Sequence, residues 1–330
     1  MTCAILWCNL GTPDEPTPAA VRRYLAEFLS DPRVVEIPRA AWLPLLYGVI
    51  LPVRAGKSAA KYASIWTRDG SPLRVWTEKQ GKLLQGWLGE RGHSVKVRYA
   101  MRYGQPSIAS QLDALAAEGV TRVLVLTAYP QYSGTTTASV IDAVMQWSAK
   151  QRAVPELRFV NSYHDEPGYV DGVVRGIERY WREHFPPDHL VMSFHGVPER
   201  VVKLGDPYRD QCLESARRIA GRLGLEANRY SVSFQSRFGR AKWLEPSTEA
   251  TLRLLGKRKL KRVDVVCPGF TSDCLETLEE IAIEGRQTFV TAGGQDFRYI
   301  PCVNDDSTWI TGLTAIAEKH LAGWPTNSSR

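Results

Sequence analysis

Short apolar runs alternate with amphipathic stretches of helical length along most of the chain. Apolar runs bounded by turn residues predict buried strands, and apolar residues at helical spacing predict helices. The predicted strands are AILWCN, SVKVRYAM, RVLVLTAY, LRFVNSY, HLVMSFH, RYSVSF, RVDVVCP and FRYIP. The predicted helices include Thr17–Leu29, Ser107–Ala117, Thr136–Ala149, Gly168–Glu183, Tyr208–Leu223, Ser247–Leu255 and Asp273–Gly285.

This alternation of strands and helices predicts an α/β fold with parallel sheets that are covered by helices on both faces. A chain of 330 residues is long for a single core, so we expect two domains. The predicted strands divide into two sheets of about four strands each, with a boundary near residues 160–170. The last predicted helix, Ser307–Leu321, is expected to return to the first domain.

His195 draws attention because it follows the apolar run HLVM and enters a Gly-Pro turn in the stretch SFHGVPER. Ligands of open parallel sheets bind beyond the carboxyl ends of the strands, which is where this turn is expected. A histidine held there can exchange a proton near neutral pH. Strand-end histidines also serve only to bond a backbone carbonyl, and the pattern alone leaves both interpretations open.

The predicted helix Asp273–Gly285 carries a row of glutamates, Glu276, Glu280 and Glu284, each four residues from the next. Like charges at this spacing cost about 0.2–0.5 kcal/mol per pair, so helix stability does not explain the row. It is either a solvated acidic face or a set of carboxylates that binds or relays a cation. The apolar face of the same helix is predicted at Leu275, Leu278 and Ala282.

The segment Ala41–Gly56 breaks the pattern because it is apolar almost throughout and contains two prolines. It is too short to span a bilayer. It is therefore either a buried connection or an exposed apolar lip for a large flat ligand or a membrane surface.

Composition narrows the choice of partners and compartment. The formal net charge is +7, with its densest patch in GKRKLKR, Gly256–Arg262, which predicts helix C-terminal capping or weak attraction to anionic lipid. Basic and aromatic residues are not interleaved on one face, so no nucleic-acid partner is expected. With no membrane-spanning run and no basic leader, a cytoplasmic location is expected. The six cysteines are expected to be reduced: Cys3, Cys8, Cys212, Cys267, Cys274 and Cys302.

Four long motifs occur in one order along the chain: SFHGVPER, GDPYRDQC, FQSRFGRAKWLEP and CPGFTSDCLETLEEI. In this order they resemble the ferrochelatase family. The stretches NLGTP, KYASIWTRDGSPL and YPQYSGTT extend the resemblance over nearly the whole chain, and the spelling CLETLEE resembles the proteobacterial branch.

The resemblance implies a lyase that inserts ferrous iron into protoporphyrin IX to form protoheme, the last step of heme biosynthesis. It implies the chelatase fold, which is two Rossmann-like domains, each a four-stranded parallel sheet flanked by helices, with the porphyrin cleft between them. The expected domains are residues 1–163 plus 306–330, carrying the cleft lip and the returning helix, and residues 164–305, carrying His195 and Glu276.

By motif, the resemblance makes His195 and Glu276 the catalytic and metal-binding residues, without deciding which is chiefly the base and which the ligand. It places Glu280 and Glu284 on a metal or proton path. The implied porphyrin-binding residues are Leu10, Tyr62 and Trp243, and the implied lip residues are Trp42, Leu46 and Ile50.

Two departures from the family pattern concern cysteine. Relatives with a [2Fe–2S] cluster hold it by four cysteines, several near the C-terminus, whereas this chain has none after Cys302. We therefore expect no cluster and no cofactor, with iron as a substrate. Cys274 stands where many relatives have a histidine. It is either a buried structural thiol or a ligand of iron.

Other functions stay open at this point. One is a porphyrin or heme carrier without catalysis, which would need an apolar cleft but no glutamate row. Another is a chelatase for coproporphyrin III, and the long motifs argue against cobalt insertion into sirohydrochlorin. Weak peripheral membrane contact is compatible with the sequence, and the oligomeric state is not legible from it.

Overall fold

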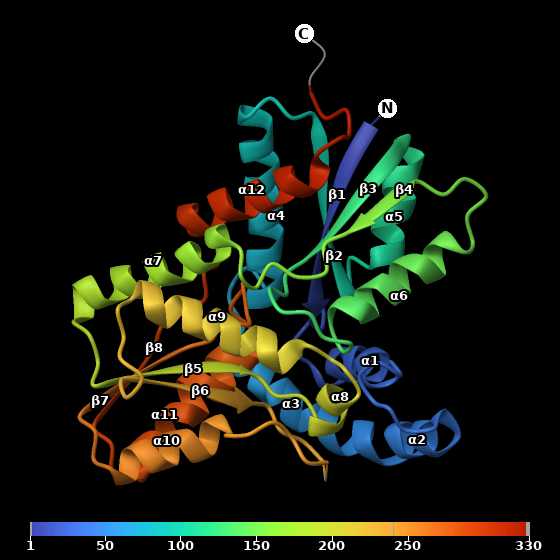
Figure 1. Cartoon of the computed structure of the whole chain (residues 1–330). Coiled ribbons are helices and arrows are strands. Elements are labelled where there is room, and N and C mark those ends of the chain that lie inside the picture. Colours follow the sequence, from blue (N-terminus) through green and yellow to red (C-terminus); the bar gives the residue numbers. More distant parts are fainter. Residues whose placement is uncertain (1, 240, 328–330) are drawn as a thin grey trace. The chain divides into compact units, whose positions relative to one another are not determined.

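A computed structural model describes residues 2–239 and 241–327 of the chain (Figure 1). The chain separates into two compact units. The first comprises Met1–Tyr129, Ser133–Asn161 and Thr314–Arg330, and the second comprises Pro130–Tyr132 and Ser162–Leu313. Each unit holds one four-stranded sheet whose neighbouring strands are all parallel. The predicted α/β class is therefore confirmed.

The first sheet has the strand order β2-β1-β3-β4, so the first strand is an inner one. The elements of this unit are β1 (Thr2–Gly11), α1 (Pro18–Leu29), α2 (Arg39–Leu45), η1 (Leu46–Ile50), α3 (Leu51–Ile65), α4 (Pro72–Glu90), β2 (Val95–Tyr103), α5 (Ile108–Ala117), β3 (Val120–Thr127), α6 (Thr137–Ser148) and β4 (Glu156–Phe159). Thr17 and Ser107 cap the helices that follow them, as the sequence predicts for these residue types.

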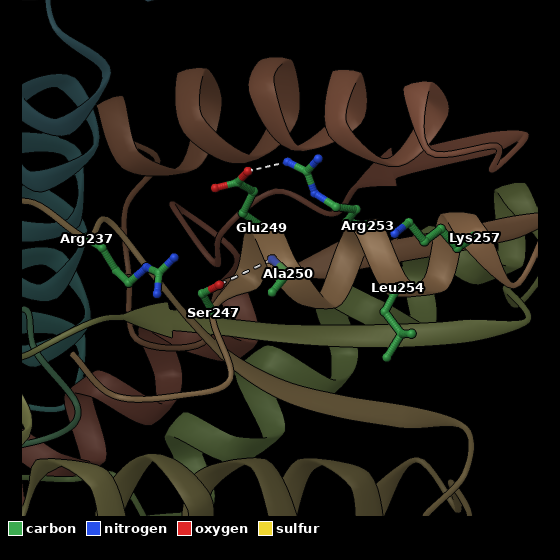
Figure 2. Close-up of a pocket in the computed structure, with 7 residues that line it drawn as sticks. All are labelled: Arg237, Ser247, Glu249, Ala250, Arg253, Leu254 and Lys257. Carbon is green, nitrogen blue, oxygen red and sulfur yellow. Dashed lines mark hydrogen bonds and ion pairs between the residues drawn. The ribbon is translucent and has the colours of Figure 1, made fainter. Parts of the chain in front are cut away.

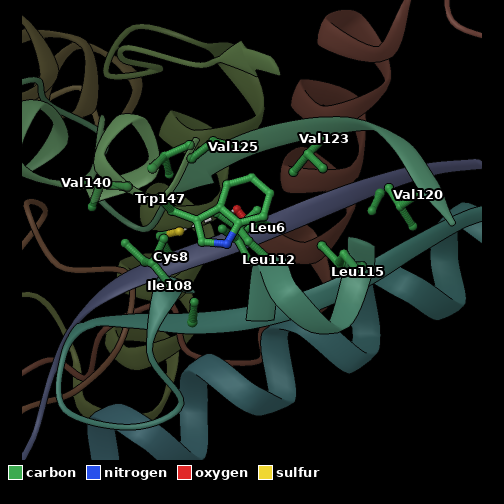
Figure 3. Packing of buried hydrophobic residues seen from close by; sticks show 13 residues of the cluster. Leu6, Cys8, Ile108, Leu112, Leu115, Val120, Val123, Val125, Val140 and Trp147 are labelled. Atoms are coloured by element: carbon green, nitrogen blue, oxygen red, sulfur yellow. Dashed lines mark hydrogen bonds between the residues drawn. The ribbon is translucent and has the colours of Figure 1, made fainter. Parts of the chain in front are cut away.

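Strand β1 is buried on both faces, which is why it reads as a nearly continuous apolar run. Side chains alternate across a strand. Leu6 and Cys8 therefore face one layer, where they pack with residues of α5 and α6 such as Leu112 and Trp147 (Figure 3). Trp7 points to the other face, where Gly81 of α4 lies beside its ring.

The second sheet has the order β6-β5-β7-β8, the same pattern of strands as the first. Its unit contains α7 (Pro167–His184), β5 (His189–His195), α8 (Glu199–Lys203), α9 (Tyr208–Arg222), β6 (Tyr230–Gln235), α10 (Thr248–Lys257), β7 (Arg262–Val266), η2 (Glu276–Gly285), α11 (Arg286–Thr291) and β8 (Asp296–Tyr299). Leu252, Ile281 and Phe289 bring α10, η2 and α11 onto one face of this sheet, where they pack with Val191 and Val265.

The last helix, α12 (Ser307–Leu321), begins in the second unit and ends in the first. We expected residues 306–330 to belong wholly to the first domain, and this differs for the first turns of α12. Trp309 stacks on Tyr163 with ring centroids 6.0 Å apart, and Gly312 lies so close to Gly168 that an added Cβ would meet its backbone at 2.4 Å. These contacts hold the start of α12 in the second unit.

Residues 130–132 also belong to the second unit, although the expected first domain ran without a break to residue 163. The amide of Gln131 explains this, because its Nε2 donates to Tyr169 Oη at 3.2 Å and to Ser215 Oγ at 2.9 Å. Both partners lie in the second unit, on α7 and α9.

The apolar segment 41–56 forms consecutive helical turns rather than an irregular connection. Pro44 lies inside α2, and the π-helical turn η1 follows directly. Proline removes one backbone donor from a helix, and a widened turn is one way to accommodate the defect. The helices expose Tyr47, Val49 and Val53, which are 49%, 53% and 60% accessible. No helix among residues 2–239 and 241–327 is long and apolar enough to cross a membrane.

Residues 276–285, predicted as an α-helix, form the π-helix η2. Its wider turns change which side chains share a face. Thr277 and Ile281 are buried, whereas the predicted apolar face is only half-buried, at Leu275, Leu278 and Ala282. The prediction was wrong here because it assumed the α-helical period.

Candidate active site

His195 is the last residue of β5, and its imidazole is half-buried. Its Nδ1 lies 2.6 Å from the carbonyl oxygen of Gly196. A carbonyl oxygen can only accept, so Nδ1 carries the proton of the neutral ring. Nε2 then has a lone pair that can accept a proton or bind a metal ion. The backbone contact that seemed to compete with a chemical role therefore selects the tautomer that such a role needs.

The turn after His195 is held against the end of β6. The amide of Gly196 donates to Gln235 O at 2.7 Å, and a Cβ at Gly196 would lie 2.6 Å from that oxygen and 3.3 Å from Trp243 Cε3. The amide of Leu244 donates to Val197 O at 3.0 Å, which ties the Trp243 loop to the same turn. Only glycine fits this approach of two backbones.

We predict that Gly196→Ala lowers the free energy of unfolding by about 1–3 kcal/mol, because its methyl group overlaps a backbone oxygen that cannot move freely. Chemical denaturation measures the change. Gly221→Ala in α9 is the control, since a Cβ there meets nothing within 4 Å. Equal stability of the Gly196→Ala protein and the unsubstituted protein would mean that the turn is not tightly held.

Gln235 connects His195 with Glu276. It is the register partner of His195 in the β5–β6 ladder. Its Nε2 donates to the backbone carbonyl of Glu276, the first residue of η2, at 2.7 Å. Gln235 thus adjoins both residues singled out by motif, His195 through strand pairing and Glu276 through its side chain, although 81 positions separate them in sequence (276 − 195 = 81).

Glu280, one helical turn further, faces the same place. Its carboxylate accepts from the Ser236 amide at 2.6 Å and from the Ser236 hydroxyl. Burial raises the pKa of Glu280, with Glu276 acting in the same direction, while the bonds from Ser236 and the proximity of His195 act against it. His195 and Glu276 both lie near enough to Glu280 to act on its charge. Glu284, the last member of the row, is exposed.

Sequence reasoning missed Gln235 and Ser236. Ser236 adopts a left-handed backbone with φ 64°, which is uncommon for serine and points both its amide and its hydroxyl at Glu280. A signal was present, since the two polar residues directly follow the apolar strand in SVSFQS, at a sheet edge where ligands bind.

A buried carboxylate anchors the chain just before η2. Asp273 accepts from Asn304 Nδ2 at 2.7 Å, from Thr277 Oγ1 at 3.1 Å and from the Tyr299 hydroxyl. The next residue, Cys274, is buried, and burial, reinforced by the Glu276 carboxylate, raises the pKa of its thiol well above the usual value. A thiol in that state is a poor metal ligand.

A cavity of about 890 Å³ adjoins β6 and η2. Glu280 and Glu284 line it, together with Ser236, Phe238 and Trp243. The Trp243 ring is nearly buried, and its Nε1 donates to Phe238 O at 3.0 Å. The cavity gives solvent a way to Glu280, whereas His195 and Glu276 are not among its lining residues.

The other predicted residues lie in the first unit. Leu10 is half-buried near the end of β1. Tyr62 is nearly buried and meets Tyr24 edge to face, with centroids 6.3 Å apart. Trp42 is half-buried and donates from Nε1 to Leu29 O at 2.6 Å.

Ile50 is half-buried, whereas Leu46 is fully buried with Leu29, Val35 and Leu51. The lip prediction was wrong for Leu46, because its side chain points into the core of the first unit. The exposed apolar side chains of this segment are those of Leu45, Tyr47, Val49 and Val53.

Histidine and carboxylate groups are the side chains of the site that could bind a metal ion, through His195 Nε2 and the Glu276 carboxylate. Among residues 2–239 and 241–327, no three His, Cys, Asp or Glu side chains are arranged as a metal-holding group. The six cysteines are all buried and free.

Solved structures share this fold. SirB from Bacillus subtilis, determined with Fe³⁺, aligns with a TM-score of 0.56 at 11% identity, over 98% of this chain and 96% of SirB. CbiX, described as the terminal enzyme of siroheme biosynthesis in denitrifying bacteria, aligns with a TM-score of 0.53 at 13% identity, over 97% of this chain and 100% of CbiX. At these identities the likeness concerns the fold alone, and it confirms the predicted chelatase fold.

Sequence comparison is more specific. The family model described as ferrochelatase matches residues 2–321. The ferrochelatase of Methylibium petroleiphilum is 64% identical over 99% of this chain and 90% of its own, and that of Polaromonas sp. is 63% identical over 99% and 89%. The ferrochelatase of a Janthinobacterium strain is 59% identical over 98% and 88%. With this family model spanning nearly all of its length, the chain belongs to the ferrochelatase family.

Proposed function

We propose that the chain is a lyase that inserts ferrous iron into protoporphyrin IX and releases protoheme. Family membership supports the reaction class. The observation that supports the mechanism is that His195 and Glu276 both lie near enough to Glu280 to act on its charge, and that Gln235 pairs with His195 in the sheet and bonds Glu276 O.

Metallation of a porphyrin requires the loss of two pyrrole protons and the loss of water from the iron ion. The neutral His195 ring can take a pyrrole proton at Nε2, since Nδ1 is occupied by the Gly196 carbonyl. The Glu276 carboxylate can hold the cation or accept the second proton. Imidazole nitrogen and carboxylate oxygen both suit ferrous iron.

Glu280 and Glu284 supply a route for protons or iron between this place and solvent. Glu280 is largely buried and has a raised pKa, so it can exchange a proton closer to neutral pH than an ordinary carboxylate. Glu284 is exposed and lines the same cavity as Glu280. Such a route would give the row of glutamates a function that a solvated acidic face would not have.

Porphyrin contacts are assigned by motif to Leu10, Tyr62 and Trp243, and to Trp42 and Ile50 of the lip segment. Apolar and aromatic surface supplies most of the binding energy of a flat macrocycle. Part of that energy can bend the ring and expose its nitrogen lone pairs. Leu46 is excluded from this set because it is fully buried in the first unit.

We infer that no iron–sulfur cluster is needed. Cys267, Cys274 and Cys302 lie in the second unit, and burial raises the pKa of each thiol well above its usual value. Cluster ligands are thiolates, so these side chains are unsuited to the role in this state. Iron enters as the substrate.

The decisive experiment mixes the full chain with protoporphyrin IX and Fe²⁺ under anaerobic conditions and follows the heme absorption spectrum. Heme formation that is faster than without protein supports the proposal. Porphyrin binding without faster metallation would instead identify a carrier. Competition between protoporphyrin IX and coproporphyrin III decides which porphyrin is preferred.

We further propose a cytoplasmic protein with weak peripheral membrane contact through the end of α10. Within residues 2–239 and 241–327, Lys257, Arg258, Lys259 and Lys261 form no ion pair. Of these, Lys257 lines a pocket of about 250 Å³, together with Arg237, Arg253 and the half-exposed Leu254 (Figure 2). Each cation near an anionic membrane contributes about 1 kcal/mol.

Replacing Lys257, Arg258, Lys259 and Lys261 by glutamine is therefore expected to abolish cosedimentation with phosphatidylglycerol vesicles at low salt, leaving phosphatidylcholine vesicles unbound as before. The control replaces four ion-paired arginines of α7 and α9, namely Arg175, Arg217, Arg218 and Arg222. An equal loss of vesicle binding in the control would mean that the effect depends only on net charge. Vesicle binding that persists at high salt would assign the membrane contact to the exposed apolar side chains of α2 and α3.

A further inference from the structure

A series of buried hydroxyl groups, joined by hydrogen bonds, leads to Gln235. Ser193 of β5 and Ser233 of β6 are register partners, and both are fully buried. Each hydroxyl contacts Thr248 Oγ1 at the start of α10, at 2.7 Å for Ser193 and 2.9 Å for Ser233. None of these residues is used by the mechanism above, and buried hydroxyls are retained only where their hydrogen bonds are satisfied.

Of these three hydroxyl groups, only that of Ser193 also bonds Gln235, whose side chain contacts η2. Its hydroxyl donates to Gln235 Oε1 at 2.7 Å, and the Cys267 thiol reaches the same oxygen at the longer distance of 3.6 Å. With Oε1 turned toward β5, the amide nitrogen of Gln235 is turned toward η2. It donates to Glu276 O at 2.7 Å and lies 3.4 Å from Glu280 Oε2.

The opposite orientation of the amide is electrostatically unfavourable. A flipped Gln235 would present Oε1 to the Glu276 carbonyl and to the Glu280 carboxylate, which are both acceptors. The Glu276 carbonyl would lose its partner at the first residue of η2. A buried amide keeps its orientation only when both of its ends are matched, and Ser193 supplies the strong donor at one end.

We propose that Ser193 is a positioning residue that acts through the Gln235 side chain to hold the first turn of η2, and with it Glu276, in place relative to His195. The inference rests on the proposed function. It is distinct from a catalytic role, because the buried Ser193 hydroxyl bonds Gln235 and Thr248 and makes no hydrogen bond to the side chain of His195 or Glu276 in the described part of the chain.

The test compares Ser193→Ala with Ser233→Ala, which removes a hydroxyl of equal burial and the same Thr248 contact but no bond to Gln235. We expect Ser193→Ala to lower kcat for heme formation about tenfold, with the KM for protoporphyrin within about twofold, since misplaced catalytic groups affect turnover more than binding. Ser233→Ala is expected to keep kcat within about twofold.

Two further variants separate positioning from stability. Ser193→Thr keeps the hydroxyl group but adds a methyl group in a packed strand. It is therefore expected to lower Tm and yet to retain kcat. In a Gln235→Leu background, Ser193→Ala is expected to cause no further fall in kcat, because the partner through which it acts is gone.

Wild-type kcat in Ser193→Ala, an equal loss in Ser233→Ala, a kcat that follows Tm across the series, or full additivity with Gln235→Leu would each overturn the proposal. Failure of the proposed function itself is recognised separately, because the unsubstituted protein would then form no heme. Should Ser193→Ala not fold, Ser193→Thr and Gln235→Leu decide the question, since positioning predicts a retained kcat in the first and a lowered kcat in the second.

Discussion

Replacing His195 by alanine is expected to lower kcat for heme formation by about 10²-fold or more, the range in which positioned acid–base groups contribute. The reason is the fixed tautomer. Nδ1 is engaged by the Gly196 carbonyl at 2.6 Å, so Nε2 is the atom left to take a proton or bind iron, and alanine offers no substitute. The measurement is anaerobic initial-rate kinetics with protoporphyrin IX and Fe²⁺.

His184→Ala serves as the control for this variant. His184 is another imidazole of the second unit, at the C-terminal end of α7, where its ring packs at a tilt against Tyr180 with ring centroids 4.4 Å apart. Its removal is expected to leave kcat within about twofold, since it lies outside the proposed site. Near-normal turnover of a folded His195→Ala protein would remove His195 from the mechanism.

Replacing Glu276 by alanine or by glutamine is expected to lower kcat by a similar factor of about 10² or more. The glutamine variant is the sharper of the two, because it keeps the volume of the side chain and the backbone carbonyl that Gln235 binds at 2.7 Å. An amide is neither an effective base nor a good ligand for ferrous iron. Iron and porphyrin are varied separately, so that a rise in the KM for iron is distinguished from a fall in kcat.

The control is Glu249→Gln, which removes an exposed carboxylate of α10 that pairs with Arg253. It is expected to be nearly silent, since exposed ion pairs contribute little. A folded Glu276→Gln protein that turns over at the unsubstituted rate would leave the carboxylate role to Glu280, and the proposed division of labour would be wrong.

The layers of the fold were predictable from the sequence because buried parallel strands have a strong local signal. The run HLVMSFH predicts a strand at residues 189–195, and β5 spans His189–His195. Both faces of such strands are covered, so the run is apolar and its ends are marked by turn residues. The same reasoning placed His195 at the end of this strand. Its side chain is half-buried there, whereas the strand residues before it are buried.

The details of η2 could not be predicted in this way. A π-helix has no distinct composition, so an argument from residue spacing assumes the commoner α-helical period and assigns the wrong buried face. What stabilises the wider turn lies elsewhere in the chain, in the Gln235 amide on Glu276 O and the Ser236 groups on Glu280. The left-handed conformation of Ser236 likewise has no sequence signal, because it depends on its partner.

The apolar segment 41–56 shows a different limit. Its composition indicated two alternatives, a buried connection or an exposed lip, and the structure contains both, with Leu46 in the core and Val53 exposed on the following helix. Hydrophobicity alone does not distinguish these positions. Their separation follows from helical geometry, which directs neighbouring side chains to different sides.

Both sheets place the earliest strand of their unit between the second and third, since the orders are β2-β1-β3-β4 and β6-β5-β7-β8. Such repetition is what the duplication of one ancestral gene segment would produce, followed by divergence that erased any visible similarity between the copies. In that case the imidazole of His195, the last residue of β5, has no counterpart at the end of β1, which finishes on Gly11.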